Sequence, residues 1–196
     1  MRQIVLATKN QGKIREVKAE LQGFEMEILT LEKEPSFPDV IEDGSSFLEN
    51  ALKKAKAVSD FTGKAAMADD SGLEVDILGG KPGVFSSRYS GPEATDEANI
   101  KKLIDDLKGI PEGKRGACFR CVIVLYRPGG DYDVFEDTLK GRITIEPAGQ
   151  NGFGYDPVFF VPDLNMTVAQ MPPELKNSIS HRGKALRALK KSLQTK

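Results

Sequence analysis

The sequence predicts an α/β protein with a mixed sheet, and two patterns carry that prediction. In the first half of the chain, strand-like apolar runs alternate with helical segments, which favours a sheet with helices packed against it. Further along, two runs rich in β-branched and aromatic residues flank Pro128-Gly-Gly130, a pattern typical of an antiparallel hairpin. A sheet that contains both arrangements is mixed.

Each element has its own signal. Residues of high β-propensity between turn residues predict strands at Gln3–Thr8, Glu25–Leu31, Ala65–Ala68, Leu73–Leu78, Cys118–Tyr126 and Tyr132–Leu139. Helical periodicity and capping residues predict helices over Lys13–Leu21, from Ser46 to Gly63, over Thr95–Leu107 and from about His181 to Leu193. Loops are expected at Pro35–Gly44, Gly79–Pro92, Gly109–Gly116 and Glu146–Pro157. No linker divides the chain, so we expect a single domain over residues 1–196.

The charges of the 196-residue chain nearly cancel, with 28 basic and 29 acidic side chains and a net charge of −1. Because this balance gives no basic field, we expect no nucleic-acid partner. The apolar run at the N-terminus is interrupted by Lys9 and is too short for a signal peptide. No other run approaches the length of a membrane span, so we expect a cytoplasmic protein that does not contact membranes.

The two cysteines, Cys118 and Cys121, have the C-x-x-C spacing of a redox pair or of half a zinc site. In a strand, however, residues three apart face opposite ways and lie about 10 Å apart. A disulfide needs Cα atoms within about 7 Å. A zinc site needs two more ligands, and the chain has a single histidine. The strand interpretation is therefore favoured.

The segment Ala7–Lys13, ATKNQGK, joins a strand end to a polar loop and a lysine at the start of a helix. Helix N-termini attract anions and disfavour lysine, so a bound anion would explain Lys13. The spacing is not that of a P-loop. A plain turn with a solvated lysine is the alternative.

The segment Ala68–Val75, ADDSGLEV, places two carboxylates after a short apolar run. If Asp69 and Asp70 end a strand, their side chains diverge, and only one points directly into a given pocket. Carboxylate oxygens suit Mg²⁺, and Glu42 in the acidic loop is a plausible second ligand. The alternative is a surface turn, which Asp-Ser-Gly forms readily.

The segment Asn151–Phe159, NGFGYDPVF, places three aromatic residues among glycines. Gly152 and Gly154 free the backbone around Phe153, whose ring can stack on a nucleobase. An aromatic turn between strands explains the pattern equally well.

The segment Ser178–Ala185, SISHRGKA, places His181 and Arg182 in the first turn of a helix that Ser180 caps. The helix dipole disfavours cations there, which suggests donors aimed at a ligand, with Lys176 as a third donor upstream. A solvated basic helix end costs only about a few tenths of a kcal/mol, so that alternative stays open.

The helix that begins after Ser46 has a capping box, in which Glu49 reaches back toward the helix start. One apolar face is expected, formed by Leu48, Ala51, Leu52, Ala55 and Val58. Glu49, Lys53 and Lys56 can form a salt-bridge ladder, an interpretation favoured for Glu49 and less clear for Lys53. Ser86, Ser87 and Arg88 in GGKPGVFSSRYSG either brace a site or face a partner.

Six motifs, taken in order, resemble those of the Ham1/RdgB family of inosine and xanthosine triphosphate pyrophosphatases. They are ATKNQGK, EDGSSFLENALKKA, ADDSGLEV, GGKPGVFSSRYSG, GFGYDP and SHRGKA, and they extend from near residue 3 to about residue 190. The resemblance implies an elongated α/β fold with two lobes and an active site in the cleft between them. It implies Mg²⁺-dependent hydrolysis of ITP, dITP and XTP to the monophosphate and pyrophosphate, and a homodimer.

The resemblance also implies roles for residues. Asp70 would be the catalytic base and a metal contact, and Glu42 the second metal ligand, with Asp43 as its rival. The substrate-binding residues would be Thr8, Lys9, Asn10, Gln11, Gly12, Lys13, Lys53, Ser71, Phe153, Gly154, Tyr155, Asp156, Lys176, His181 and Arg182. Within that set, residues 8–13 would hold mainly phosphate, residues 153–156 the base and sugar, and the last three the base. A related pyrophosphatase for other modified nucleotides, or a nucleotide sensor without turnover, is the alternative.

Overall fold

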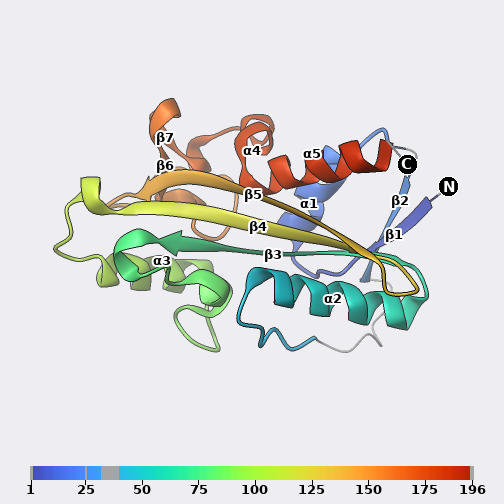
Figure 1. Ribbon diagram of the computed structural model, residues 1–196. Coiled ribbons are helices and arrows are strands. Elements are labelled where there is room, and N and C mark those ends of the chain that lie inside the picture. The colour runs from blue at the N-terminus through green and yellow to red at the C-terminus, as the bar shows by residue number, and fades with distance from the viewer. Residues whose placement is uncertain (1, 25, 32–39, 195–196) are drawn as a thin grey trace. The chain divides into compact units, whose positions relative to one another are not determined.

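A computed structural model describes residues 2–24, 26–31 and 40–194 (Figure 1). Its seven strands form one sheet in the order β2-β1-β3-β4-β5-β6-β7. Strand β1 pairs in parallel with β2 and β3, whereas β6 pairs antiparallel with β5 and β7. The strands are β1 Arg2–Leu6, β2 Met26–Thr30, β3 Ala65–Val75, β4 Gly116–Tyr126, β5 Tyr132–Ile143, β6 Phe159–Val161 and β7 Met166–Thr167. The predicted α/β fold with a mixed sheet is confirmed.

The sequence predicted every described α-helix except α4. The helices are α1 Gln11–Glu20, α2 Phe47–Thr62, α3 Asp96–Asp106, α4 Pro173–Ile179 and α5 His181–Gln194. Helix α4 was not predicted, because its seven residues are too few to show a periodic apolar face. Helix α2 begins after Ser46, whose side chain accepts the Glu49 N–H, and ends at Gly63 in the left-handed region. Glu49 reaches back one residue further than a capping box requires, to the N–H of Ser45 at 2.7 Å.

The chain divides into two compact units, and the boundaries between them fall within strands β3, β4 and β5 and at the start of helix α5 (His181–Gln194). The first unit contains Met1–Asp70, Cys121–Asp137 and Arg182–Lys196, and the second contains Ser71–Arg120 and Thr138–His181. The sequence-based expectation of a single two-lobed domain stays a prediction.

In the first unit, the strands bury side chains on both faces. On one face, Ile4 and Leu6 of β1 and Met67 of β3 pack with residues of α1 and α5. On the other face, Val5 of β1 and Ala66 of β3 pack with Ala51, Ala55 and Val58 of α2. Because successive strand residues point to opposite faces, each face is covered by its own helix or helices.

The second unit has a core of its own. Leu73 and Val75 of β3 pack with Leu103 of α3, with Leu107 directly after that helix, and with Phe159 of β6. All five side chains are fully shielded from solvent. Within β3, the residues that follow Asp70 therefore belong to a different core from those that precede it.

The expected DDSG turn between two strands is wrong. Strand β3 runs without a break from Ala65 to Val75, and both Asp69 and Asp70 are buried within it. The sequence suggested a turn because Asp-Ser-Gly forms one readily. Burying two adjacent carboxylates in a strand is costly unless their charges are compensated. Cations from neighbouring elements face both carboxylates, as shown below, and that compensation cannot be read from the local sequence.

Other expectations fare differently. Leu48 is 39% exposed and does not belong to the buried face of α2. Ala51, Ala55 and Val58 are buried there as predicted, and Leu52 is partly buried against the same cluster. Cys118 and Cys121 lie in one strand, β4, as predicted. Residue 25 of the second predicted strand and residues 35–39 of the acidic loop lie outside the described residues. Within the described part of the chain, no helix is long and apolar enough to cross a membrane.

Candidate active site

The loop after β1 ends in a capped helix N-terminus. The Thr8 hydroxyl accepts the N–H of Asn10 at 3.2 Å, and the Asn10 side chain accepts the N–H of Lys13 at 3.1 Å. These bonds start α1 at Gln11, two residues earlier than predicted. Lys9, Asn10 and Gln11 are exposed at this end. The arrangement suits an anion, because the first amide groups of a helix have no partner within it.

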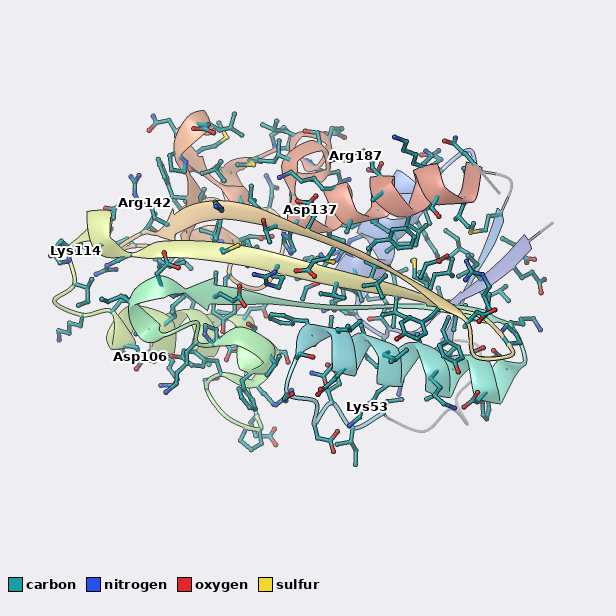
Figure 2. All side chains as sticks on the ribbon, viewed as in Figure 1. Lys53, Asp106, Lys114, Asp137, Arg142 and Arg187 are labelled. Atoms are coloured by element: carbon teal, nitrogen blue, oxygen red, sulfur yellow. The ribbon has the colours of Figure 1, made fainter. Side chains whose placement is uncertain are left out.

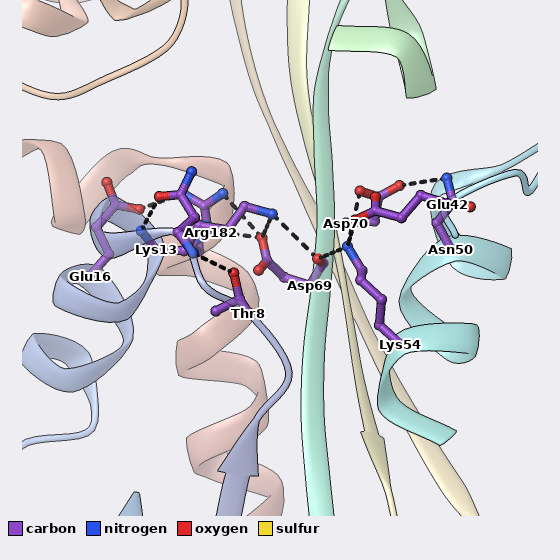
Figure 3. A network of polar contacts seen from close by, with 10 residues as sticks. Thr8, Lys13, Glu16, Glu42, Asn50, Lys54, Asp69, Asp70 and Arg182 are labelled. Carbon is purple, nitrogen blue, oxygen red and sulfur yellow. Dashed lines mark hydrogen bonds and ion pairs between the residues drawn. The ribbon is translucent and has the colours of Figure 1, made fainter. Parts of the chain in front are cut away.

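Asp69 gathers cations from α1 and α5 on one side of β3 (Figure 3). Lys13 Nζ lies 3.0 Å from Asp69 Oδ2, and Arg182 donates Nε and Nη2 to the same oxygen at 3.2 and 3.1 Å. Arg182 also donates Nη1 to Glu16 of α1 at 2.5 Å.

The electrostatics of this group are dominated by the ion pairs. Burial acts to raise the pKa of Asp69, but Lys13 and Arg182 together hold that pKa far below its usual range. Burial likewise acts to lower the pKa of Arg182, but Asp69 and Glu16 raise it. Asp69 and Arg182 are therefore both charged at neutral pH.

Asp70 points to the opposite side of β3, toward α2 (Figure 3). Its Oδ2 accepts the side-chain N–H of Asn50 at 3.1 Å, and its Oδ1 lies 3.5 Å from Lys54 Nζ. Lys54 also donates to the Asp69 carbonyl oxygen at 2.9 Å and lies 3.2 Å from Glu42 Oε1. The divergence of the two aspartates, expected from strand geometry, is confirmed.

The groups around Asp70 shift each other's pKa. Burial raises the pKa of Asp70 above its usual value, and the nearby charge of Glu42 raises it further against the opposing effect of Lys54. Burial acts to lower the pKa of Lys54, but Asp70, Asp69 and Glu42 raise it. A carboxylate with a raised pKa beside a permanent cation is suited to accept a proton.

The Glu42–Asp70 pair fits a hard divalent cation. Both carboxylates already face one cation, the Lys54 ammonium, and Mg²⁺ prefers carboxylate oxygens. Among the described residues, no group of three or more His, Cys, Asp or Glu side chains converges as a metal cluster. Asp43, the rival ligand, is instead paired with Lys53 at an exposed position.

The second unit gathers another group of predicted residues, centred on Asp156. This buried carboxylate accepts the N–H of Phe153 at 2.9 Å and the ammonium of Lys176 at 2.6 Å. The Lys176 ammonium also lies 4.5 Å from the centre of the Phe153 ring. Gly152 is required beside it, because a Cβ at that position would lie 2.0 Å from Asp156 Oδ2. Asp156 therefore fixes the shape of its own loop.

Three further contacts hold this group in place. Gly154 donates its N–H to Asp96 of α3 at 2.6 Å, and Tyr155 donates its hydroxyl to the carbonyl of Ser86 at 2.8 Å. His181 stacks on Phe119 of β4, with ring centres 4.9 Å apart. The contact to Ser86 shows that the GGKPGVFSSRYSG loop braces the segment after Phe153, which is one of its two expected roles.

The predicted residues are thus divided between the two units. Thr8, Lys13, Glu42, Lys53, Asp70 and Arg182 are in the first unit with the rest of the residues 8–13. The second unit holds the others, which are Ser71, Phe153, Gly154, Tyr155, Asp156, Lys176 and His181. The assignment of these residues to a substrate stays a prediction.

The sequence interpretation missed the lysine that faces Asp70. Lys53 projects from α2 to an exposed ion pair with Asp43, whereas Lys54 is buried at the carboxylates (Figures 2 and 3). Asn50 was missed as well. Both have the helical spacing of the buried residues Ala51, Ala55 and Val58, and that signal was available. Glu16 had no comparable signal, because its partner Arg182 is distant in sequence.

Comparison with known proteins agrees with this architecture. The model of the Ham1 family matches residues 4–192. A "dITP/XTP pyrophosphatase" of Geobacter sulfurreducens is 52% identical over 98% of this chain and 97% of its own length. One from Vibrio parahaemolyticus is 48% identical over 96% and 95% of the two chains.

Solved structures agree equally well. A HAM1 protein from Coxiella burnetii matches with a TM-score of 0.92 and 42% identity over 100% of both chains. The Staphylococcus aureus Ham1 protein matches with a TM-score of 0.89 and 42% identity over 99% of both chains. Since sequence, fold and the order of the motifs agree over nearly the whole length, this chain belongs to the Ham1 family.

Proposed function

We propose that this chain hydrolyses non-canonical purine nucleoside triphosphates, namely dITP, ITP and XTP, to the monophosphate and pyrophosphate. The relatives from Geobacter sulfurreducens and Vibrio parahaemolyticus are named dITP/XTP pyrophosphatases. The observation that carries the proposal is the Asp69–Asp70 pair in β3. Asp69 organises cations beside the helix N-terminus, and Asp70 faces a lysine and a second carboxylate. Such an enzyme would remove deaminated purines from the nucleotide pool.

The start of α1 would bind the triphosphate. Its first amide groups and the Lys13 ammonium offer hydrogen-bond donors and positive charge to phosphate oxygens. Asp69 holds the Lys13 ammonium through its carboxylate at 3.0 Å and its backbone carbonyl at 3.4 Å, which leaves the third N–H for a ligand. Lys9, Asn10 and Gln11 are exposed at the same end and would extend the grip on the outer phosphates.

Asp70 would act as the general base. A water molecule attacks the α-phosphorus, its proton passes to the Asp70 carboxylate, and the bond to the β-phosphate oxygen breaks. The electron pair leaves with pyrophosphate. Asn50 and Lys54 use only part of the acceptor capacity of Asp70, so a lone pair is available for the water.

Glu42 and Asp70 would hold Mg²⁺, and the fit of this pair to a cation supports that assignment. When bound, Mg²⁺ neutralises negative charge that develops on the leaving phosphates. Lys54 lies between the two carboxylates and would contribute positive charge to the same place.

The base would be read by Lys176, His181 and Arg182, with Phe153 stacked on it. Hypoxanthine and xanthine carry an oxygen at position 6, which accepts hydrogen bonds, whereas adenine carries an amino group. Lys176 and Arg182 are already oriented by Asp156 and by Asp69 with Glu16. Donors that are fixed in this way discriminate strongly, because the wrong base leaves them without an acceptor.

Incubation with ITP and MgCl₂, followed by ion-exchange separation of the products, tests the proposal. We expect IMP and pyrophosphate. IDP with orthophosphate would refute the assigned bond cleavage, and binding of ITP without turnover would identify a sensor. Parallel assays with modified pyrimidine triphosphates distinguish a pyrophosphatase of different specificity.

A further inference from the structure

Asn50 is a fully buried polar side chain that lies between two parts of the proposed metal site. Its Oδ1 accepts the backbone N–H of Gly44 at 2.8 Å, and its Nδ2 donates to Asp70 Oδ2 at 3.1 Å. The orientation of the amide follows from these partners, because an N–H needs the oxygen and a carboxylate needs the nitrogen. Asn50 therefore ties the backbone two residues after Glu42 to the Asp70 carboxylate (Figure 3).

Gly44 makes this close approach possible. A Cβ at position 44 would lie 2.6 Å from Asn50 Oδ1 and 2.9 Å from the Cβ of Glu49. A real Cβ does not come that close, so the loop reaches Asn50 only because this residue is glycine. The contact thus depends on the identity of both residues, the glycine at position 44 and the asparagine at position 50.

We propose that Asn50 is a positioning residue that sets the relative placement of Glu42 and Asp70. This inference rests on the proposed function, since it names those two side chains as the metal ligands and Asp70 as the base. An aspartate on a strand has several staggered rotamers available, and a bond to a rigid, buried amide selects one of them. The same amide fixes the Glu42 loop, so one side chain aligns both carboxylates.

A purely structural role is the competing explanation, and the chain contains a matched control for it. Asn99 of α3 is 4% exposed; its Oδ1 accepts the N–H of Ser90 at 2.8 Å, and its Nδ2 donates to the Ser87 carbonyl at 3.2 Å. Like Asn50, Asn99 ties a loop backbone to a helix. It differs in donating to a peptide carbonyl instead of a carboxylate of the site.

The experiment compares Asn50→Ala with Asn99→Ala, and Asn50→Asp with Asn99→Asp. We expect the melting temperatures of the two alanine variants to fall by similar amounts, and likewise those of the two aspartate variants. Only the Asn50 variants should show a lower kcat for ITP. We expect a decrease of about 10- to 100-fold, as is typical when a residue that supports a metal ligand is removed, and a change in KM of less than about threefold. The aspartate variants preserve shape and provide the comparison if the alanine variants do not fold. If Asn50→Ala folds and keeps the wild-type kcat, a loss confined to Asn50→Asp would overturn the proposal, because added charge would then explain it.

A second measurement requires no substrate. Titration with Mn²⁺, followed by electron paramagnetic resonance, should show binding that is about tenfold weaker in Asn50→Ala and unchanged in Asn99→Ala. If the wild type binds Mn²⁺ but does not hydrolyse ITP, the proposed function fails while the positioning role is still tested by this titration. Wild-type Mn²⁺ affinity and kcat in a folded Asn50→Ala variant would overturn the role of Asn50, as would equal losses in Asn99→Ala.

Discussion

At the scale of single residues, the central feature is that two neighbouring aspartates have separate environments. Asp69 is surrounded by Lys13 and Arg182, which stabilise its charge, whereas burial raises the pKa of Asp70. Environment therefore assigns different tasks to two chemically identical side chains. Asp69 is suited to hold cations in place, and Asp70 is suited to accept a proton.

The first prediction concerns Asp70. The Asp70→Asn change preserves shape and removes basicity, so the variant should fold normally and lose about 10²- to 10⁴-fold in turnover of ITP. Circular dichroism verifies folding, and pyrophosphate release measures turnover. Hydrolysis close to the wild-type rate would eliminate Asp70 as the base.

The second prediction separates two adjacent lysines. Lys54→Gln leaves Glu42 and Asp70 without their buried cation, and we expect kcat for ITP to fall by about 100-fold or more, as when a charge-stabilising donor is lost. Lys53→Gln breaks only an exposed pair with Asp43 and should cost much less. Steady-state kinetics of both variants provide the comparison. A larger loss in Lys53→Gln would contradict this expectation and support the sequence-based prediction that Lys53 binds substrate.

The third prediction concerns base recognition by Arg182. Arg182→Ala should lower kcat/KM more for ITP and XTP than for ATP, narrowing the gap between them, because only the 6-oxo bases accept its hydrogen bond. The variant also leaves Asp69 and Glu16 without their buried partner, which typically destabilises a protein by about 3–5 kcal/mol. Urea unfolding must therefore establish a temperature at which it is folded. Equal losses for ITP, XTP, ATP and GTP would restrict Arg182 to a role in folding or phosphate binding.

At the scale of elements, short loops are fixed to helices by single polar contacts. The cap at Asn10 starts α1, Ser46 starts α2, and Thr95 starts α3 through its bond to the N–H of Ala98. The loop between β3 and α3 is tied to α3 by the Tyr89 hydroxyl, which donates to Asp106 at 2.5 Å. These contacts set the positions of the helices on which the site depends.

The fourth prediction uses this tyrosine. Burial and the bond to Asp106 raise the pKa of Tyr89 to about 12, from an ordinary value near 10. As the pH rises, the Tyr89 hydroxyl therefore loses its proton in the unfolded chain before it does so in the folded chain. The stability that the contact provides is fully present below about pH 10 and is lost as the pH rises toward 12. Tyr89→Phe lacks this contribution. The difference in unfolding free energy between wild type and Tyr89→Phe should shrink over that interval in alkaline urea titrations; a constant difference would contradict the pKa shift.

At the scale of the whole molecule, each unit has its own hydrophobic core and its own group of predicted site residues. The first unit supplies groups suited to phosphate and metal, and the second supplies an aromatic ring and donors suited to a base. The net charge of −1 agrees with a small anionic substrate that is bound by local cations.

The fifth prediction concerns assembly. The family resemblance implies a homodimer, so light scattering after size-exclusion chromatography should give about twice the chain mass of 21.4 kDa. Large apolar side chains such as Phe85 and Ile77 are about half exposed, and an interface would remove such surface from water. The mass of a single chain at every concentration in a dilution series would contradict the dimer.

The sequence alone determined much of the molecule. Strand propensity, helix caps and the hairpin turn identified the α/β class and the longer helices and strands, because these signals are local. The short elements β6, β7 and α4 were not predicted, and β3 was predicted as two strands. Alternation along a strand was enough to predict that Asp69 and Asp70 point to opposite sides. The order of six motifs identified the family.

The tertiary structure decided which charges meet. The carboxylates of Asp69 and Asp70 are tolerated inside an unbroken strand because Lys13, Lys54 and Arg182 surround them from three helices. Arg182 lies 113 positions from Asp69 in the chain, so no local pattern could reveal the pair. Which of Lys53 and Lys54 faces Asp70 likewise depends on which face of α2 meets the sheet. Burial and charge pairing are properties of the folded chain, and they determine where the chemistry of this sequence lies.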